Sequence, residues 1–260
     1  MPLVTLDGLY RARPQPGWAV CCFGVCNLES LSAVIGAAED EAAPVAVSID
    51  PEVVRTGMRA LAAAALALAR EAAVPVAVHL NHAHSLDLIM WALDAGLTSV
   101  MLDGSALPYA ENLALTRRAN QIASQSGASV EGELPAPRTV AEVDQAAQFV
   151  RRTGVGYLAV TVGSRGLDLN LLSRLAEACT ARLALHGASR LAGEALARAI
   201  RGGVSKVNVH TELQRAFLDG VREALDSGRK GLPEIMGRGA ELTRAAARAA
   251  IRRCGASDLD

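Results

Sequence analysis

The sequence predicts an α/β protein: a closed barrel of eight parallel strands and eight helices, the (β/α)8 or TIM barrel, as a single domain over residues 1–260. Eight short apolar or β-branched runs recur at intervals of 24 to 31 residues, which fit one strand, one helix and two loops. The runs are apolar on both faces, as parallel strands covered on both sides are. Aromatic residues make up 3% of the chain and hydrophobic residues 51%, so Ala, Leu and Val fill the core, which suits helices packed closely on a sheet. A doubly wound open sheet is the second choice.

Each predicted strand lies within one of the eight apolar runs. The runs begin at Trp18, Pro44, Pro75, Ser99, Ser129, Tyr157, Arg182 and Lys206. Between them, apolar residues spaced by three and four predict helices. The clearest are Val53 to Glu71, Glu111 to Ser126, Val140 to Arg152 and Leu191 to Ile200. We expect a short helix within Leu3 to Gln15 to close the barrel floor, and a terminal helix over Pro233 to Arg253.

Composition narrows the partners to small molecules. Lys and Arg number 26 against 27 Asp and Glu, a formal charge of -1, which gives no electrostatic reason to expect nucleic acid or an anionic membrane. The longest strongly apolar stretch, Ala60 to Ala69, is far below the roughly 20 residues that span a bilayer. The five cysteines are an odd number without a CxxC pair, so neither a disulfide framework nor a zinc ribbon is indicated. We expect free thiols and a cytoplasmic protein.

Polar residues gather where the predicted strands end, which is the active-site face of such barrels. They are Asn27, Ser48, Asp50, His79, Asn81, His82, His84, Asp103, Ser105, Glu131, Glu133, Gly163, Ser164, Arg165, His186, Gly187, Ser189, Asn208, His210 and Thr211. All five histidines of the chain are among them. Their collection at one rim argues against an ordinary set of core histidines.

His82 and His186 project from the third and seventh predicted strands toward a common centre, where they could share a zinc ion. A catalytic zinc usually has three protein ligands, and Glu131, Glu133, His84 or His210 would supply the third. A hydrogen-bonded polar cluster without metal is the alternative.

The loops after the seventh and eighth strands are the usual phosphate position in this fold. Gly187 lets the backbone approach an oxyanion, Ser189 and Thr211 offer hydroxyls, and Arg190 adds a charged fork. The alternative is that Ser189 and Thr211 only cap the next helices.

The chain resembles the class II, zinc-dependent ketose-bisphosphate aldolases, the fructose- and tagatose-bisphosphate aldolase group. The motifs that carry the resemblance, in order, are CNLESLSAVIGAAE, PVAVHLNHAHS, AGLTSVMLDGSALPYAENLALTRR, VEGEL, RRTGVGYLAV, LALHGAS and KVNVHTEL. The resemblance implies zinc acting as a Lewis acid on an enediolate of dihydroxyacetone phosphate, helped by a neighbouring aspartate.

Carried over by position, the resemblance makes His82 and His186 two of three zinc-binding histidines. It makes Asp103 and Glu133 carboxylates near an alternate metal position. It also implies a set of residues that hold the ketose phosphate, namely Gly163, Gly187, Ser189, Asn208 and Thr211.

Four departures from the family pattern bear on catalysis. HLNHA stands where the family has HLDHG, so Asn81 replaces the catalytic aspartate with an amide that exchanges no proton near neutral pH. VGSRG stands for GTxHG, which puts Arg165 at the third zinc histidine. After VEGEL the family has a Gly-rich loop that carries a proton-transferring glutamate. In this chain PAPRT follows directly, and that loop is absent. Position 210, commonly small or acidic, is His210.

We therefore expect a divergent aldolase-type lyase for a phosphorylated ketose or related carbonyl compound, in which Arg165, His84 or His210 takes over lost roles. Zinc, if bound, would be held by His82, His186 and Glu133, and we expect a homo-oligomer, a dimer or tetramer. The alternatives are a non-catalytic sugar-phosphate-binding paralogue and an ordinary zinc-dependent fructose- or tagatose-bisphosphate aldolase.

Overall fold

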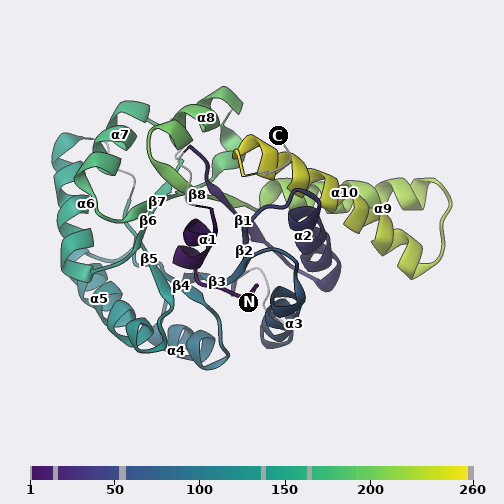
Figure 1. Cartoon of the computed structure of the whole chain (residues 1–260), viewed down its shortest axis with the longest axis horizontal. Helices are drawn as coiled ribbons and strands as arrows, with labels where there is room; N and C mark the ends of the chain where they lie inside the picture. Colours follow the sequence, from purple (N-terminus) through teal and green to yellow (C-terminus); the bar gives the residue numbers. More distant parts are fainter. Residues whose placement is uncertain are drawn as a thin grey trace.

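The computed structural model of the chain describes residues 2–13, 17–52, 57–135, 139–162, 166–191 and 193–256, without the side chain of Arg190. Eight parallel strands close into a barrel in chain order, and β8 pairs with β1 (Figure 1). The strands are β1 Val20–Gly24, β2 Val45–Ile49, β3 Val76–Ala83, β4 Ser99–Leu102, β5 Ser129–Glu133, β6 Tyr157–Thr161, β7 Arg182–His186 and β8 Val204–Val209. Each strand overlaps one of the eight apolar runs, although β8 begins two residues before its run, and the predicted barrel is confirmed.

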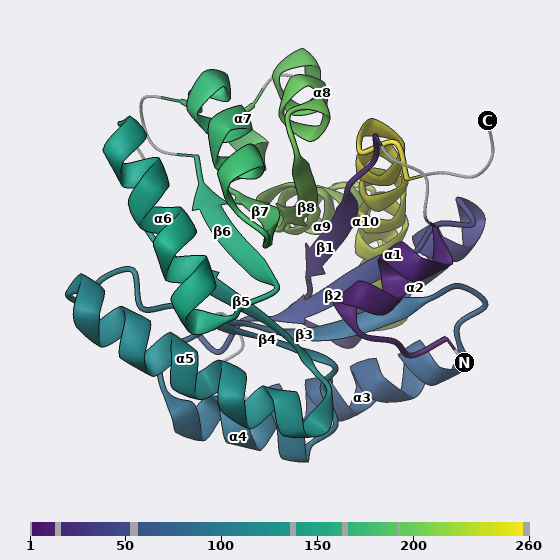
Figure 2. The same cartoon turned by 60° about the vertical axis from the view of Figure 1, so that its left-hand side comes forward.

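Helices surround the barrel and cover the outer face of its strands (Figure 2), except for the short first helix, which lies across one end. They are α1 Leu6–Ala12, α2 Leu28–Asp40, α3 Met58–Glu71, α4 Leu86–Asp94, α5 Tyr109–Ser126, α6 Val140–Thr153, α7 Leu169–Ala178, α8 Gly193–Arg201, α9 Thr211–Asp226 and α10 Leu232–Arg253, with a 3-10 turn η1 over Ala188–Arg190. None of the helices in the described ranges combines the length and apolarity of a membrane span.

The predicted helices are present, with shifted ends. The helix predicted over Val53 to Glu71 begins at Met58, and residues 53–56 lie outside the described ranges. The helix predicted over Leu191 to Ile200 is α8, which starts at Gly193 because the chain first makes η1 and Leu191 is extended.

The short helix α1 lies across the amino-terminal end of the barrel, as predicted for the floor. Its Asp7 carboxylate accepts hydrogen bonds from Ser129 Oγ (2.9 Å) and Tyr157 Oη (3.0 Å), at the starts of β5 and β6. Tyr10 Oη donates to the carbonyl of Ser205 in β8. These contacts close the end of the barrel that faces away from the strands' carboxyl ends.

The last two helices of the chain, α9 and α10, form an antiparallel arm that projects beyond the barrel (Figure 1). The two helices approach so closely that a Cβ on Gly220 would lie 2.5 Å from the carbonyl oxygen of Arg238. The amino end of α9 is at the barrel rim, so the arm is continuous with the loop that follows β8.

A buried ion pair crosses the barrel interior. Glu131 of β5 accepts hydrogen bonds from Lys206 Nζ of β8 and from His186 Nε2 of β7, both at 2.8 Å. Lys206 Nζ also donates to Asn208 Oδ1 at 2.7 Å, and neither Glu131 nor Lys206 is exposed to solvent. Burial raises the pKa of Glu131, but Lys206 and His186 outweigh it and hold the pKa well below its usual range. Glu131 and Lys206 are therefore both charged, and each neutralises the buried charge of the other.

Removing one partner of this pair should be strongly destabilising. Lys206→Met leaves the Glu131 carboxylate without its cation, and we expect the free energy of unfolding in urea to fall by about 3–5 kcal/mol. The double variant Glu131→Gln with Lys206→Met should recover most of the loss, because no buried charge is left unpaired. Arg222→Met, which breaks an exposed pair with Asp219, is the control that should change little. A Lys206→Met protein as stable as the unmodified one would contradict this account.

Candidate active site

A pocket of about 290 Å³ opens at the carboxyl ends of the strands. Its described lining comes from six strand ends and the loops that follow them. The lining residues are Asp50, Asn81, His82, Glu133, Thr161, His186, Gly187, Ala188, Ser189, Asn208, His210, Thr211 and Glu212. Most of the site residues predicted from the sequence are among them.

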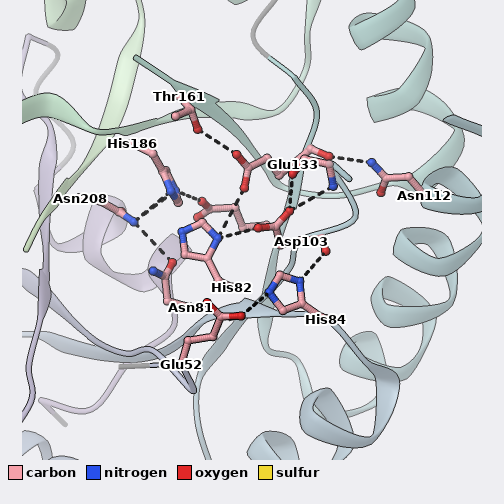
Figure 3. Close-up of polar contacts among 12 residues, drawn as sticks. Glu52, Asn81, His82, His84, Asp103, Asn112, Glu133, Thr161, His186 and Asn208 are labelled. Carbon is pink, nitrogen blue, oxygen red and sulfur yellow. Dashed lines mark hydrogen bonds and ion pairs between the residues drawn. The ribbon is translucent and has the colours of Figure 1, made fainter. Parts of the chain in front are cut away.

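Three groups suited to a metal ion converge in this pocket. The ligand atoms of His82, Glu133 and His186 all lie within 4.8 Å of one another (Figure 3). The imidazole rings of His82 and His186 meet edge to face with their centroids 5.1 Å apart. The strands β3, β5 and β7 thus bring together the three residues that the sequence analysis named as tentative ligands.

His82 is held in place by its backbone and by a carboxylate. It has φ +42°, a left-handed conformation, inside an irregular part of β3 between Leu80 and Ala83. Its Nδ1 donates to Asp103 Oδ2 at 2.8 Å, so in the neutral ring the lone pair is on Nε2. Burial lowers the pKa of His82, but the bond to Asp103 and the charge of Glu133 outweigh it and raise the pKa.

Glu133 has one engaged and one free oxygen. Oε1 accepts a hydrogen bond from Thr161 Oγ1 at 2.8 Å, while Oε2 is buried with no hydrogen-bond partner, 3.6 Å from His82 Nδ1. Burial and the nearby Asp103 raise the pKa of Glu133 to about 7. A buried carboxylate oxygen without a donor is a group that a cation would satisfy.

His186, like His82, is held by a hydrogen bond to a carboxylate, but through its other ring nitrogen. Its Nε2 donates to Glu131, which leaves the lone pair on Nδ1, 3.5 Å from Asn208 Nδ2. Burial lowers the pKa of His186, so the neutral ring is favoured. Each histidine therefore has one nitrogen bound to a carboxylate and the other available, the usual arrangement of zinc-binding histidines. Two imidazoles, a free carboxylate oxygen and an open pocket fit a catalytic zinc site.

The loops after β7 and β8 form a second part of the pocket wall. Gly187 has φ +70° and precedes η1, which contains Ser189, while Thr211 is the first residue of α9. The N-cap positions belong to Gly187 and His210, and neither makes a side-chain cap. The interpretation of Thr211 as the N-cap of the next helix is therefore wrong, because Thr211 is already the first residue of α9. Ser189 lies within η1, and residue 192, which precedes the next helix α8, lies outside the described ranges. The amino end of α9 faces the pocket without a cap, which favours an anion.

His210 and His84, two candidates for catalytic roles, have different surroundings. His210 lines the pocket, and its Nε2 lies 2.8 Å from Gln214 Nε2 and 3.7 Å from Cys26 Sγ. Burial lowers the pKa of His210. His84 is exposed, is not among the pocket-lining residues, and contacts the backbone oxygen of Asp103 (3.1 Å) and Glu52 (3.5 Å) (Figure 3).

The remaining predicted site residues differ in how far the structure describes them. Gly163 and Arg165 lie outside the described ranges, and only the backbone of Arg190, in η1, is described. Asn81 is buried in the pocket wall, with its Oδ1 3.4 Å from Asn208 Nδ2.

Sequence reasoning gave no specific role to three residues that shape the site, although it placed Asp50 on the active-site face. Thr161 binds Glu133, Lys206 binds Glu131, and Asp50 lines the pocket. Lys206 had a recognisable signal, since a lone lysine in an apolar strand run needs a buried partner. Glu131, considered as a third metal ligand, instead bridges His186 and Lys206.

Comparison with known proteins identifies the family of the chain. Residues 4–258 match the family model of class II fructose-bisphosphate aldolase. A fructose-bisphosphate aldolase of Thermus caldophilus is 35% identical over 88% of this chain and 89% of its own. The crystal structure of the YdjI aldolase from Escherichia coli K12 superposes with a TM-score of 0.91 at 32% identity, covering 98% of both chains. A putative fructose-1,6-bisphosphate aldolase of Coccidioides immitis has a TM-score of 0.86 at 28% identity, over 97% of this chain and 95% of its own. The chain belongs to the class II fructose-bisphosphate aldolase family.

Proposed function

We propose that the protein is a zinc-dependent carbon–carbon lyase that cleaves a phosphorylated ketose or a related phosphorylated carbonyl compound. The observation that carries the proposal is the combination, in one pocket, of the His82, Glu133 and His186 donors with the uncapped amino end of α9. A ketose phosphate has a carbonyl group that a metal ion held by these donors can bind, and a phosphate anion that the amino end of α9 can bind.

His82, Glu133 and His186 would hold the zinc ion. When bound, zinc supplies Lewis-acid stabilisation of negative charge on substrate oxygens. Asp103 and Glu131 keep the two imidazoles in position by accepting a hydrogen bond from one nitrogen of each ring, and the other nitrogen of each ring would hold the ion.

The phosphate would bind between Gly187 and the amino end of α9. The hydroxyls of Ser189 and Thr211 and the amide of Asn208 face this pocket and can donate to phosphate oxygens. Gly163 belongs to the same proposed set through the family resemblance, and Arg190 through the charged fork that its guanidinium offers.

His210 is our candidate for proton transfer. Asn81 can orient a substrate oxygen but cannot exchange a proton near neutral pH. His210 lies in the pocket wall, and a pKa below the ordinary value leaves it neutral and able to accept a proton. The exposed His84 is the weaker candidate, and Arg165 remains proposed as a positive charge that stabilises the developing oxyanion.

We further propose a cytoplasmic homo-oligomer, a dimer or tetramer. Leu218 and Leu225 of α9 and Leu232 of α10 are large exposed apolar residues on the projecting arm. Apolar groups grouped on a protruding element are typical of a surface that is covered by a second chain.

The lyase proposal predicts metal-dependent release of triose phosphate. In a coupled assay with a panel of ketose phosphates, the zinc-supplemented protein should cleave at least one of them, and a chelator should abolish the reaction.

His210→Asn should lower kcat by about 10²-fold or more, because a proton-transfer group is lost, while His84→Asn should have a much smaller effect. Fructose bisphosphate should be a poor substrate, and Asn81→Asp alone should gain little, since residues that act together do not contribute additively. Binding of ketose phosphates without any cleavage would instead indicate a non-catalytic binder.

The phosphate site predicts a specific loss of binding. The double variant Ser189→Ala with Thr211→Ala should bind a sugar phosphate at least about tenfold more weakly by calorimetry, because two donors to the anion are removed. Ser124→Ala, whose hydroxyl bonds to the backbone of its own helix α5, is the matched control. An unchanged affinity in the double variant would place the anion elsewhere.

A further inference from the structure

Asp50 places a carboxylate in the pocket wall that neither the metal cluster nor the phosphate site uses. It follows β2 directly and lines the pocket together with His210. Its Oδ1 accepts a hydrogen bond from the backbone nitrogen of Glu52 at 2.9 Å, which fixes the side chain. Its Oδ2 makes no hydrogen bond or ion pair with any residue that the structure describes.

The negative charge of Asp50 acts on the inside of the pocket. Its side chain lines the same pocket as His82 of β3 and His210, which follows β8. Glu52, two residues further on, points elsewhere, because it contacts the exposed His84 and does not line the pocket. The carboxylate of Asp50 therefore belongs to the substrate side of the loop.

Asp50 also follows a strand that is not a neighbour of the two strands before the proposed phosphate loops. The phosphate loops follow β7 and β8, whereas β2 is separated from β8 by β1 in the barrel order. A ketose phosphate anchored at α9 and reacting beside His82 would direct the rest of its carbon chain away from the β7 and β8 loops. The wall between β8 and β3 that such a chain meets contains Asp50 and His210.

We propose that Asp50 makes the site selective for ketose monophosphates whose far end carries uncharged hydroxyl groups, and against bisphosphates. This inference rests on the proposed function and names its substrate class. The carboxylate accepts hydrogen bonds from sugar hydroxyls, whereas a second phosphate would bring like charges together in a partly desolvated pocket. The lining that the structure describes holds three carboxylates, those of Asp50, Glu133 and Glu212.

The test compares two hexitol phosphates of the same stereochemistry, the 1-phosphate and the 1,6-bisphosphate. Neither has the carbonyl group needed for cleavage, so binding can be measured by calorimetry on the zinc-supplemented protein without turnover. The unmodified protein should bind the monophosphate at least about tenfold more tightly than the bisphosphate. Asp50→Asn should reduce that ratio at least about fivefold, mainly by tightening the bisphosphate, because the amide keeps the acceptor for Glu52 and removes only the charge.

Glu52→Gln is the matched control, since it removes an equal charge two residues away outside the pocket, and its ratio should equal that of the unmodified protein. Asp50→Ser provides a second variant without the carboxylate in case the amide disturbs the loop. Equal binding of the two compounds by the unmodified protein, or a ratio unaffected by both Asp50 variants, would overturn the inference and leave the lyase proposal standing. Failure of both compounds to bind would overturn the proposed function and the inference with it.

Discussion

The candidate site depends on one buried charge, the carboxylate of Glu131. It is enclosed by the barrel and joins three strands, because it accepts hydrogen bonds from His186 of β7 and Lys206 of β8 while belonging to β5. A carboxylate in such a place must be paired, and the pairing fixes the ring of His186 with its second nitrogen available. Lys206 also donates a hydrogen bond to Asn208 and so fixes its side chain. The amide nitrogen of Asn208 contacts His186 and Asn81.

A second carboxylate, that of Asp103, orients the other histidine of the site, His82. Asp103 fixes His82 as Glu131 fixes His186, but Glu133 between them keeps one oxygen buried and unsatisfied. The pKa of Glu133 is raised to about 7 by burial and by Asp103, whereas Glu131, beside Lys206, has its pKa lowered. Two glutamates two residues apart on one strand thus have separate roles: Glu131 is structural, and Glu133 is free to meet a cation.

Much of the fold and part of the site could be predicted from the sequence. The regular spacing of apolar runs predicts the barrel, and the rule that strand carboxyl ends meet on one face brings His82, Glu133 and His186 together. The Glu131 and Lys206 contact could not be predicted, because it joins residues 75 positions apart through side chains. His84 follows His82 closely, yet β3 is irregular between Leu80 and Ala83, so simple strand alternation does not place His84 in the pocket. Thr211 has a residue type common at N-caps, and only the backbone places the cap of α9 at His210.

The central claim is that His82 and His186, oriented by buried carboxylates, bind one metal ion with Glu133. The most direct test is the zinc affinity of the protein, measured by competition with a chromophoric chelator after removal of metal. We expect one site per chain, and each of the variants His82→Ala, Glu133→Ala and His186→Ala should raise the dissociation constant by at least about tenfold. Tight binding of one zinc ion per chain that persists in all three variants would contradict the account.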